Sequence, residues 1–306
     1  MNELELRQLR YFAAVAQEGQ MTRAAHRLQL AQPALSQAIA RLEAQVGVTL
    51  LERHPRGVTV TAAGAALLEK AQATLAAVED MNATARAWVR DREGTIHAGF
   101  LSLTPPMMAG NLFPRFVAEH PGVTIEWRQL DYPTREPRAW LGDADAALIW
   151  GAPTGPGVCT QAIRTSPLVV AASENHPLAT RAELRVEEVV DETFVGIVDS
   201  CDPGWLGYWG LDAYRGAPAH RTADVALTPE EAASIVASGR AITTVPALVA
   251  VPFAHLGLRA VPLIDVPPAE LTLVWPEGGA TPLVEDLIRL ARVVYQEHLE
   301  ALSVGA

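Results

Sequence analysis

One long proline-free stretch constrains the fold of this chain more than any other feature. From Ala62 to about Asp91 the sequence contains no proline, its only glycine is Gly64 near the start, and alanine is abundant. Alanine favours helix and proline breaks it, so this stretch predicts a single long helix. The full length of 306 residues corresponds to about two domains. We therefore expect three parts: an N-terminal module over residues 1–60, a linker helix over 61–91 and a C-terminal module over 92–306.

The linker helix carries a repeating stripe of small and apolar side chains. Its members recur at alternating spacings of three and four residues, which is typical of a coiled-coil seam and predicts pairing with the same helix of a second chain. The alternative is that the helix packs on its own domain. Asn82 is the single polar member, and it either sets the register between two helices or lies at a solvated edge. The stripe consists of Leu68, Ala71, Leu75, Val78, Asn82, Ala85 and Val89.

Charge is distributed unevenly between the modules. The whole chain has a net charge of −11, which by itself argues against a partner as negative as nucleic acid. Residues 1–90, however, hold ten basic and eight acidic residues, a balance of +2, and the remainder holds 14 and 27, a balance of −13. This asymmetry suggests two modules with different partners.

The composition describes an ordinary globular chain. Hydrophobic residues make up 49% and charged residues 19%, which excludes a disordered chain. The two cysteines, Cys159 and Cys201, cannot form a disulfide framework and fit a reducing cytosol. The N-terminus lacks the apolar core of a signal peptide, and no apolar stretch is long enough to cross a bilayer. We expect a cytoplasmic protein with no membrane partner.

The first 60 residues predict three helices in tight succession. Apolar residues at helical spacing begin at Leu6, and Gly19 is a suitable end for the first helix. A second, short helix begins at Thr22, whose hydroxyl can cap it. A third helix runs from about Gln32 to Val46 and ends at Gly47. This is the plan of a helix-turn-helix, whose last helix enters the major groove of DNA.

The exposed face of the third helix carries side chains that suit base edges. Glutamine can pair bidentately with adenine, arginine reaches guanine or phosphate, and serine bonds to either. A solvated face of a small helical bundle is the alternative interpretation. The residues concerned are Gln32, Ser36, Gln37 and Arg41.

A literal resemblance favours the DNA-binding interpretation. The segment RQLRYFAAVAQEGQMTRAAHRLQLAQPALSQAIARLEAQVGVTLLER, followed by RGVTVTAAG, resembles the N-terminal winged helix-turn-helix of LysR-type transcriptional regulators over nearly its whole length. In that family the part matching Gln32 to Arg41 is the recognition helix, and the turn matching Arg53 to Gly57 is a wing that reaches the adjacent minor groove. The resemblance implies DNA contacts from Thr22, Arg23, Gln32, Pro33, Ser36, Gln37, Arg41, Arg53 and Arg56.

The family pattern also implies an assembly. Family members dimerise through the linker helix and commonly pair into tetramers. The resemblance therefore implies a homodimer or homotetramer that binds an inverted repeat in double-stranded promoter DNA, with RNA polymerase as a candidate further partner. The sequence departs from the pattern at Ala31, where a serine usually caps the recognition helix, and at Gln37 and Ala38, which replace a more usual Arg-Gln pair and bear on the base preference.

After Glu93 the sequence alternates short apolar strands with helices, which predicts an α/β fold with largely parallel sheets. The segments GTIHAGF, LFPRFVAEHPGV, GDADAALIW, PLVVAASENHPLA and IVASGRAITTVPALV resemble, in order and spacing, the effector-binding region of LysR-type regulators, which is built like a periplasmic binding protein. The resemblance implies two lobes, the first over residues 93–163 and 268–306 and the second over 164–267. The expected strands are 95–101, 123–130, 144–150, 168–172, 193–198, 241–245 and 271–275, and the expected helices are 111–119, 230–238 and 283–302.

In such a fold a small-molecule effector lies between the lobes. Helix capping is the alternative role for the hydroxyl-bearing candidates. The run DPGWLGYWGLDAY, rich in aromatic residues, either lines the cleft or forms an ordinary core helix. Asp199 and Asp202 flank Cys201 and argue against a strongly anionic effector at that wall. The candidate effector contacts are Ser102, Thr104, Trp150, Ser200, Cys201, Trp205 and Thr228.

Three other functions are less well supported. Some LysR-type proteins sense peroxide through a cysteine in this region, but the only other thiol lies 42 residues before Cys201, and the flanking aspartates would raise the pKa of Cys201. A solute-binding protein would need a signal peptide. An α/β enzyme lacks a catalytic motif here, and Asp143 and Asp145 lack a third metal ligand. We expect no catalytic residue, metal or cofactor, and a transcriptional regulator whose DNA binding or bending responds to an effector of unidentified chemistry.

Overall fold

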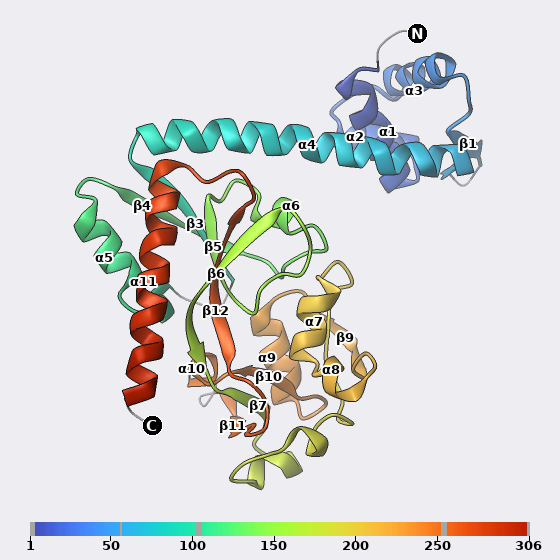
Figure 1. The fold of residues 1–306 in the computed structure, drawn as a ribbon. Helices are drawn as coiled ribbons and strands as arrows, with labels where there is room; N and C mark the ends of the chain where they lie inside the picture. The colour runs from blue at the N-terminus through green and yellow to red at the C-terminus, as the bar shows by residue number, and fades with distance from the viewer. Residues whose placement is uncertain (1–3, 56, 102–105, 252–255, 305–306) are drawn as a thin grey trace. The chain divides into compact units, whose positions relative to one another are not determined.

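The computed structural model describes residues 4–55, 57–101, 106–251 and 256–304. The chain forms two compact units, residues 1–82 and 83–306. The predicted long helix is α4 (Ala62–Arg92), which begins in the first unit and ends in the second (Figure 1). Among the described helices, none is both long and apolar enough to span a membrane. Three predicted site residues lie outside the described residues: Arg56, Ser102 and Thr104.

The first unit contains three helices, a hairpin and the start of α4. The elements before α4 are α1 (Leu6–Glu18), α2 (Met21–Arg27), α3 (Gln32–Val46), β1 (Leu51–His54) and β2 (Gly57–Val60). The three predicted helices are therefore confirmed. Gly19 and Gly47 end α1 and α3 in the left-handed conformation, with φ of 62° and 77°. Phe12, Leu35 and Leu42 are fully buried where α1 and α3 meet in the core.

The start of α2 differs from the prediction. The helix begins at Met21, and its N-cap is Gln20, whose side chain makes no capping hydrogen bond. Thr22 lies exposed inside the first turn, so the predicted capping role of Thr22 is wrong. Packing explains the shift, because Met21 belongs to the buried core and a helix that includes it orients its side chain inward.

The β1–β2 hairpin occupies the place of the predicted wing and is held at both ends. The Glu43 carboxylate of α3 accepts a hydrogen bond from the backbone N–H of Leu50 at 2.8 Å. The backbone N–H of Val58 donates to the carbonyl oxygen of Gly19 at 2.8 Å. Gly57 has a φ of 144°, and a Cβ atom there would lie 2.4 Å from the same oxygen. Only glycine allows this close approach, so Gly57 fixes the hairpin against the end of α1.

The chain's own first unit covers the first half of the predicted coiled-coil seam. Ala71 is buried in the core of that unit, and Leu68 and Leu75 pack against it. These three residues contact the core of their own domain, as in the alternative interpretation, and Ala71 is too deeply buried to meet a second chain. The last three members of the stripe are exposed, namely Asn82, Ala85 and Val89.

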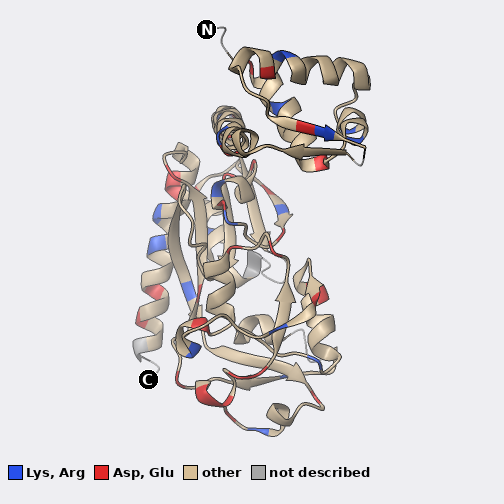
Figure 2. Cartoon of the chain, turned by 90° about the vertical axis from the view of Figure 1, so that its right-hand side faces the viewer, with Lys and Arg blue, Asp and Glu red and all other residues tan. Residues whose placement is uncertain are grey.

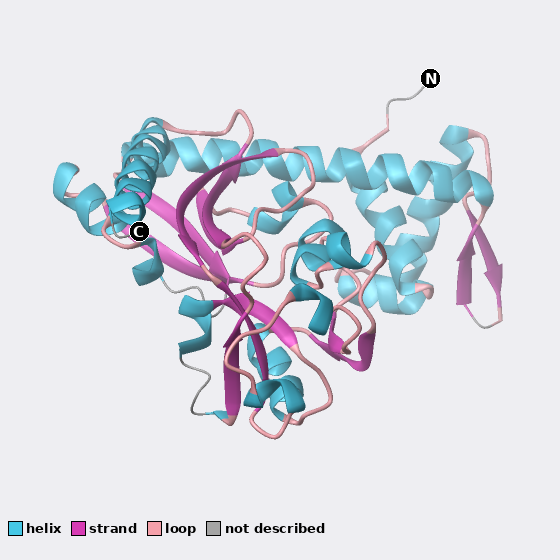
Figure 3. Ribbon diagram, turned by 60° about the horizontal axis from the view of Figure 1, so that its bottom comes forward, coloured by secondary structure: helices cyan, strands magenta, loops and turns pink. Residues whose placement is uncertain are grey.

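The second unit contains a five-stranded sheet and a second group of strands (Figure 3). In the five-stranded sheet β3 pairs in parallel with β4 and β5, whereas β12 is antiparallel to β5 and β6. In spatial order the strands are β4 (Thr124–Leu130), β3 (Thr95–Leu101), β5 (Ala146–Trp150), β12 (Ala269–Pro276) and β6 (Val158–Ser166). The accompanying helices are η1 (Pro106–Ala109), α5 (Leu112–Glu119), α6 (Pro137–Leu141) and α11 (Pro282–Val304).

The second group combines a three-stranded antiparallel sheet with a parallel pair. The sheet has the order β10 (Thr243–Pro246), β7 (Leu168–Ser173) and β11 (Leu258–Pro262), and the pair is β8 (Phe194–Ile197) with β9 (Arg221–Ala226). A bridge between Phe194 and Ile242 links the pair to the segment before β10. The helices are η2 (Pro177–Thr180), η3 (Val186–Glu188), α7 (Pro203–Trp209), α8 (Asp212–Arg215), α9 (Pro229–Ala237) and α10 (Ala247–Ala250).

The α/β class is confirmed, but the expectation of largely parallel sheets is wrong. All seven predicted strands are present, and β6, β9 and β11 occur in addition. The five-stranded sheet is mixed because β12, from near the end of the chain, inserts between β5 and β6 with the opposite direction, and the sheet of β10, β7 and β11 is antiparallel throughout. Strand order of this kind depends on contacts between distant segments, so alternation along the sequence does not reveal it.

The last turns of α4 are anchored to the five-stranded sheet by a buried ion pair. The side chains of Arg90 and Asp145 are 10% and 4% exposed and form the pair. Arg90 Nε donates to Asp145 Oδ2 at 3.1 Å, and the backbone N–H of His97 donates to the same oxygen at 2.8 Å. Asp145 directly precedes β5 and serves this anchor rather than a metal.

Removing the carboxylate of this pair should destabilise the second unit strongly. Asp145→Ala leaves the Arg90 guanidinium buried without its counter-charge, and breaking a buried pair in this way costs about 3–5 kcal/mol. The measurement is urea unfolding followed by circular dichroism. The control is Glu297→Ala, which removes an exposed ion pair with Arg115 and should cost no more than about 1 kcal/mol. Equal losses in the two variants would contradict the anchoring role of Asp145.

Candidate DNA interface and effector cavity

The structure connects α3 to the hairpin through two of the predicted DNA contacts. Arg53 Nη1, on β1, donates a hydrogen bond to Ser36 Oγ, on α3, at 2.8 Å. Ser36 is half-buried and Arg53 is exposed. The hydrogen bond therefore holds a guanidinium of the wing in register with the predicted recognition helix. The other predicted contacts on α3 are exposed: Gln32, Pro33, Gln37 and Arg41.

The predicted DNA contacts do not all lie on one face. Thr22, Gln32 and Arg53 line one cleft between the start of α2, the start of α3 and the hairpin. Arg23 lies in a separate cleft beside α2, which Thr22 also lines. Arg41 lines a third groove, together with residues of α1. The wing and the first turn of α3 thus share one cleft, whereas Arg23 and Arg41 each line a different cleft.

Basic and acidic residues both occur along the elements of the first unit (Figure 2). Ion pairing divides the basic residues into two groups. Arg23 and Arg27 share the carboxylate of Glu18, with N–O distances of 3.1 and 3.3 Å. Arg41 and Arg53 have no acidic partner within the described part of the chain. An unpaired guanidinium can bind a phosphate without first breaking an ion pair, so Arg41 and Arg53 are the cations best suited to DNA.

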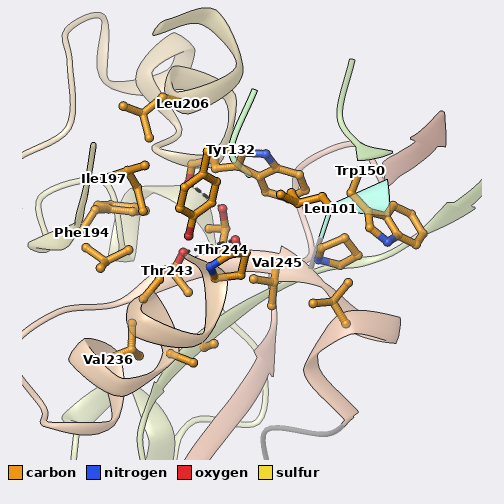
Figure 4. Close-up of a pocket in the computed structure, with 18 of the residues that line it drawn as sticks. Leu101, Tyr132, Trp150, Phe194, Ile197, Leu206, Val236, Thr243, Thr244 and Val245 are labelled. Carbon is orange, nitrogen blue, oxygen red and sulfur yellow. Dashed lines mark hydrogen bonds between the residues drawn. The ribbon is translucent and has the colours of Figure 1, made fainter. Parts of the chain in front are cut away.

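The second unit encloses a cavity of about 100 Å³. Its wall contains residues from the five-stranded sheet and residues from the second group of strands (Figure 4). Of the predicted effector contacts, Trp150 and Trp205 line it. The described lining residues are Leu101, Tyr132, Trp150, Ala171, Phe194, Val195, Ile197, Trp205, Leu206, Trp209, Arg221, Pro229, Ala232, Ala233, Val236, Thr243, Thr244, Val245, Pro246, Val249 and Leu258.

The aromatic-rich run satisfies both interpretations offered for it. It forms α7, and the buried Trp205 and Trp209 of this helix face the cavity, whereas Tyr208 is exposed. Trp205 Nε1 donates to the carbonyl oxygen of Trp150 at 2.9 Å. The rings of Trp205 and Tyr132 lie with centroids 5.8 Å apart. A core helix therefore supplies one aromatic wall of the cavity.

A buried carboxylate joins the two sides of the cavity. Asp202 is 1% exposed and caps α7 by accepting from the backbone N–H of Trp205 at 2.8 Å. The same carboxylate accepts from the Thr154 hydroxyl at 2.8 Å and from the Thr154 N–H at 3.0 Å, in the loop after β5. Burial by itself raises the pKa of Asp202, but these hydrogen bonds outweigh it and hold the pKa below its ordinary value. The carboxylate therefore stabilises the fold at neutral pH, and that contribution is lost as the pH falls through the lowered pKa.

The other predicted effector contacts that the structure describes do not line the cavity. Ser200 is exposed, and Cys201 is buried beside Asp202 without lining the cavity. The Thr228 hydroxyl accepts from the Glu231 N–H at 3.2 Å and caps α9, which is the capping role considered as its alternative.

Sequence reasoning missed the polar residues of the cavity. Tyr132 follows β4, Thr243 and Thr244 lie on β10, and Arg221 begins β9. Arg221 donates to the carbonyl oxygens of Val195 and Leu206, both at 3.0 Å. No local motif marks these positions, because they converge only after distant segments pair. The one usable signal was an arginine at the start of a short apolar segment.

The environment of Cys201 does not favour the redox alternative. Burial, followed by the nearby Asp202 carboxylate, raises the pKa of the Cys201 thiol to about 12. A thiol with so high a pKa is almost wholly protonated at neutral pH and reacts poorly with peroxide. The other cysteine, Cys159, is half-buried on β6, and both thiols are free. Within the described residues, no group of His, Cys, Asp or Glu could hold a metal ion either.

Comparison with known proteins assigns the family. Residues 6–65 match the family described as bacterial regulatory helix-turn-helix protein, lysR family. Residues 90–295 match the family described as LysR substrate binding domain. The chain belongs to the LysR family. The resemblance seen in the sequence is confirmed, and the protein is a LysR-type transcriptional regulator with an effector-binding domain.

Individual relatives agree with this assignment. The HTH-type transcriptional regulator IlvR of Caulobacter vibrioides is 31% identical over 291 residues, which cover 94% of this chain and 97% of IlvR. The Hca operon transcriptional activator HcaR of Escherichia coli is 37% identical over 205 residues, 67% of each chain. The crystal structure of CbnR, a LysR family transcriptional regulator, covers 95% of this chain and 99% of CbnR, with a TM-score of 0.57 and 22% identity, and shows the shared fold.

The burial of Cys201 predicts selective alkylation. Iodoacetamide should modify Cys159 in the native protein but leave Cys201 intact, because alkylation requires an accessible thiolate. Peptide mass spectrometry locates the modified residue. In urea both cysteines should react, which shows that Cys201 is competent once exposed. Modification of native Cys201 as fast as Cys159, or its ready oxidation by peroxide, would restore the redox alternative.

Proposed function

We propose that the first unit reads operator DNA through α3 and the β1–β2 hairpin together. The observation that carries this proposal is the Ser36–Arg53 hydrogen bond, which joins the two elements while leaving Arg53 without an acidic partner in the described chain. In the proposed complex α3 enters the major groove, where Gln32 and Gln37 reach base edges. The hairpin reaches the adjacent minor groove, whose potential attracts arginine.

The other predicted DNA contacts take supporting roles in this proposal. Arg41, unpaired and on the far flank of α3, binds a backbone phosphate. Arg23 must first leave Glu18 and contributes less. Ala31 supplies no side-chain cap to α3, so the helix start depends on Pro33 in its first turn. Thr22, Pro33 and Arg56 remain proposed contacts on the grounds of the family pattern.

We propose that a small-molecule effector binds in the cavity of the second unit and shifts the balance between two arrangements of the protein. The cavity is supported as the site by its enclosed, largely apolar wall and by contributions from both strand groups. An effector shifts such a balance only by binding one arrangement more tightly than the other. The proposed division is a reader over residues 1–60, a linker over 61–91, and two lobes over 93–163 with 268–306 and over 164–267.

The exposed end of α4 supports a homodimer. Asn82, Ala85 and Val89 lie on one helical face at coiled-coil spacing and are exposed, and Val89 is 56% exposed. Pairing of this face would place two readers on an inverted repeat and make the second DNA contact intramolecular, which raises avidity. A homotetramer, contact with RNA polymerase and a location in the cytoplasm with its DNA are further proposals.

An enzymatic function has little support. The named relatives are transcriptional regulators, and the described residues around the cavity offer no nucleophile with a lowered pKa. A solute-binding function would not explain the helix-turn-helix over residues 6–65.

Loss of the unpaired arginines should weaken DNA binding in two distinguishable ways. Arg53→Ala, alone or with Ser36→Ala, should lower the affinity for DNA upstream of the protein's own gene by about 1–3 kcal/mol, the usual cost of a lost base-edge contact. Arg41→Ala should reduce the slope of log K against log salt by about 0.9, the contribution of one phosphate contact. Band shifts at several salt concentrations give both quantities.

The matched control for these variants is Arg10→Ala. Arg10 is exposed and paired with Glu79, and it lies on α1 outside the proposed interface. Its loss should leave affinity and salt slope unchanged. Absence of binding by the wild type, or undiminished binding by the Arg53→Ala, Ser36→Ala double variant, would refute the proposed interface.

A charge on the exposed face of α4 should dissociate the dimer. Ala85→Glu places like charges opposite each other in a paired seam, where close approach needs a small side chain. Sedimentation equilibrium should show a dimer or tetramer for the wild type and a monomer for the variant. Ala76→Glu, exposed on the opposite side of the helix, is the control and should leave the assembly unchanged. Identical assemblies for Ala85→Glu and the wild type would rule out this face.

A further inference from the structure

We infer that the effector is a small monocarboxylate with a branched aliphatic or similarly compact apolar body. The inference rests on the proposed function, since it names the chemical class that the cavity of the second unit would bind. It follows from three properties of the described cavity wall: its charge, its unpaired hydrogen-bond donors and its size.

The first property is the charge of the wall. Arg221 is the only charged residue among the described lining residues, and none of them is acidic. Its guanidinium donates only to backbone carbonyl oxygens of Val195 and Leu206, and it has more N–H groups than these two bonds use. A ligand carboxylate would supply the counter-charge that the wall lacks, since Asp212, whose charge acts on Arg221, does not line the cavity. A ligand ammonium would find no anion there and would meet Arg221 instead.

The second property is a surplus of donors. The indole N–H groups of Trp150 and Trp209 are buried and have no acceptor in the described chain, and these side chains are only 2% and 8% exposed. Both tryptophans line the cavity, although the N–H groups themselves have almost no surface exposed to it. A buried donor without an acceptor carries a free-energy cost, and a ligand acceptor that meets the N–H after a turn of the ring removes this cost. Burial also raises the pKa of Tyr132, so its hydroxyl stays protonated and can donate as well.

The acidic residues near Cys201 do not oppose an anion, contrary to the expectation from sequence. The Asp202 carboxylate is fully engaged by Thr154 and Trp205 and does not line the cavity. Asp199 is exposed and absent from the described wall. The anionic wall predicted from the sequence is therefore not a wall of this cavity.

The third property is size and polarity. At about 100 Å³ the cavity is smaller than the roughly 150 Å³ of an engineered apolar cavity that holds benzene, so it takes only the compact branched end of a ligand such as isocaproate. Figure 4 shows the aliphatic Ile197, Leu206 and Val236 around the space, with Tyr132 and Thr243 between them. A second carboxylate or a polar chain would lie against these apolar side chains without partners. This excludes dicarboxylates and free amino acids as the preferred class.

Isothermal titration calorimetry with a matched ligand series tests the inference on the intact wild-type protein. Isocaproate has the proposed chemistry, isocaproamide has the same shape without the charge, and leucine adds only an ammonium group. A charged hydrogen bond is worth more than a neutral one, so the Kd of isocaproate should be lower than that of the amide and of leucine by about tenfold or more. Methylsuccinate, a branched dicarboxylate of similar size, should bind as weakly as leucine.

Two variants locate the binding. Trp209→Phe keeps an aromatic ring and removes the indole N–H. It should raise the Kd of isocaproate several-fold, and isocaproate should still bind more tightly than isocaproamide. Ala233→Leu fills the cavity and should abolish binding of every ligand in the series. Arg221 is left intact in these tests because it also braces β8 and α7.

The outcomes separate this inference from the proposed function. Equal or tighter binding of leucine, the amide or methylsuccinate, or no heat from isocaproate, overturns the ligand class, and unchanged binding to Ala233→Leu overturns the site. DNA binding by the same preparation tests the proposed function independently. If the protein binds isocaproate tightly but does not bind DNA, the proposed DNA-binding function is rejected and the ligand class stands.

Discussion

The Asp202 carboxylate is the interaction on which the second unit depends. It is buried, and it accepts hydrogen bonds from the loop after β5 and from the first turn of α7. Those two segments belong to different strand groups, and between them lie Trp150 and Trp205 of the cavity wall. A charged acceptor with three donors offsets the cost of burying it, and its lowered pKa shows that the charged form is the stable one. This contact holds two segments of the cavity's surroundings together.

Strand β5 relates this cavity to the linker helix. At its start, Asp145 forms the buried ion pair with Arg90 of α4. At its end, Trp150 lines the cavity and its carbonyl oxygen accepts from Trp205. All five residues of the strand are buried. One short, packed strand thus connects the cavity wall to the last turns of α4. A shift of the wall could change the orientation of α4 through this strand, which gives the proposed effector response a physical route.

Local signals in the sequence predicted most of the first unit. Gly19 and Gly47 end helices because each takes a left-handed φ, and the apolar spacing of α3 places Leu35 and Ile39 in the core. The start of α2 was misplaced because burial of Met21, a tertiary effect, outweighed the capping preference of Thr22. Likewise, spacing along α4 predicted a stripe but did not reveal that Ala71 would be covered by the chain itself.

The cavity was only partly predictable. Trp150 and Trp205 were found because each adjoins a recognisable strand or aromatic run, whereas Arg221 and Tyr132 reach the cavity through pairing of distant segments. The Asp202–Thr154 contact spans 48 residues and has no local signature. Cys201 was singled out for its chemistry, but its burial beside Asp202 makes it inert.

The central claim is that a ligand in the cavity changes how the first unit binds DNA. The most direct measurement is the Kd for operator DNA with and without saturating isocaproate, in the wild type and in Ala233→Leu. The ligand should change the Kd or the footprint of the wild type, and the filled variant should bind DNA without responding. A wild type that binds both ligand and operator with no mutual effect, or a filled variant that responds equally, would contradict the claim.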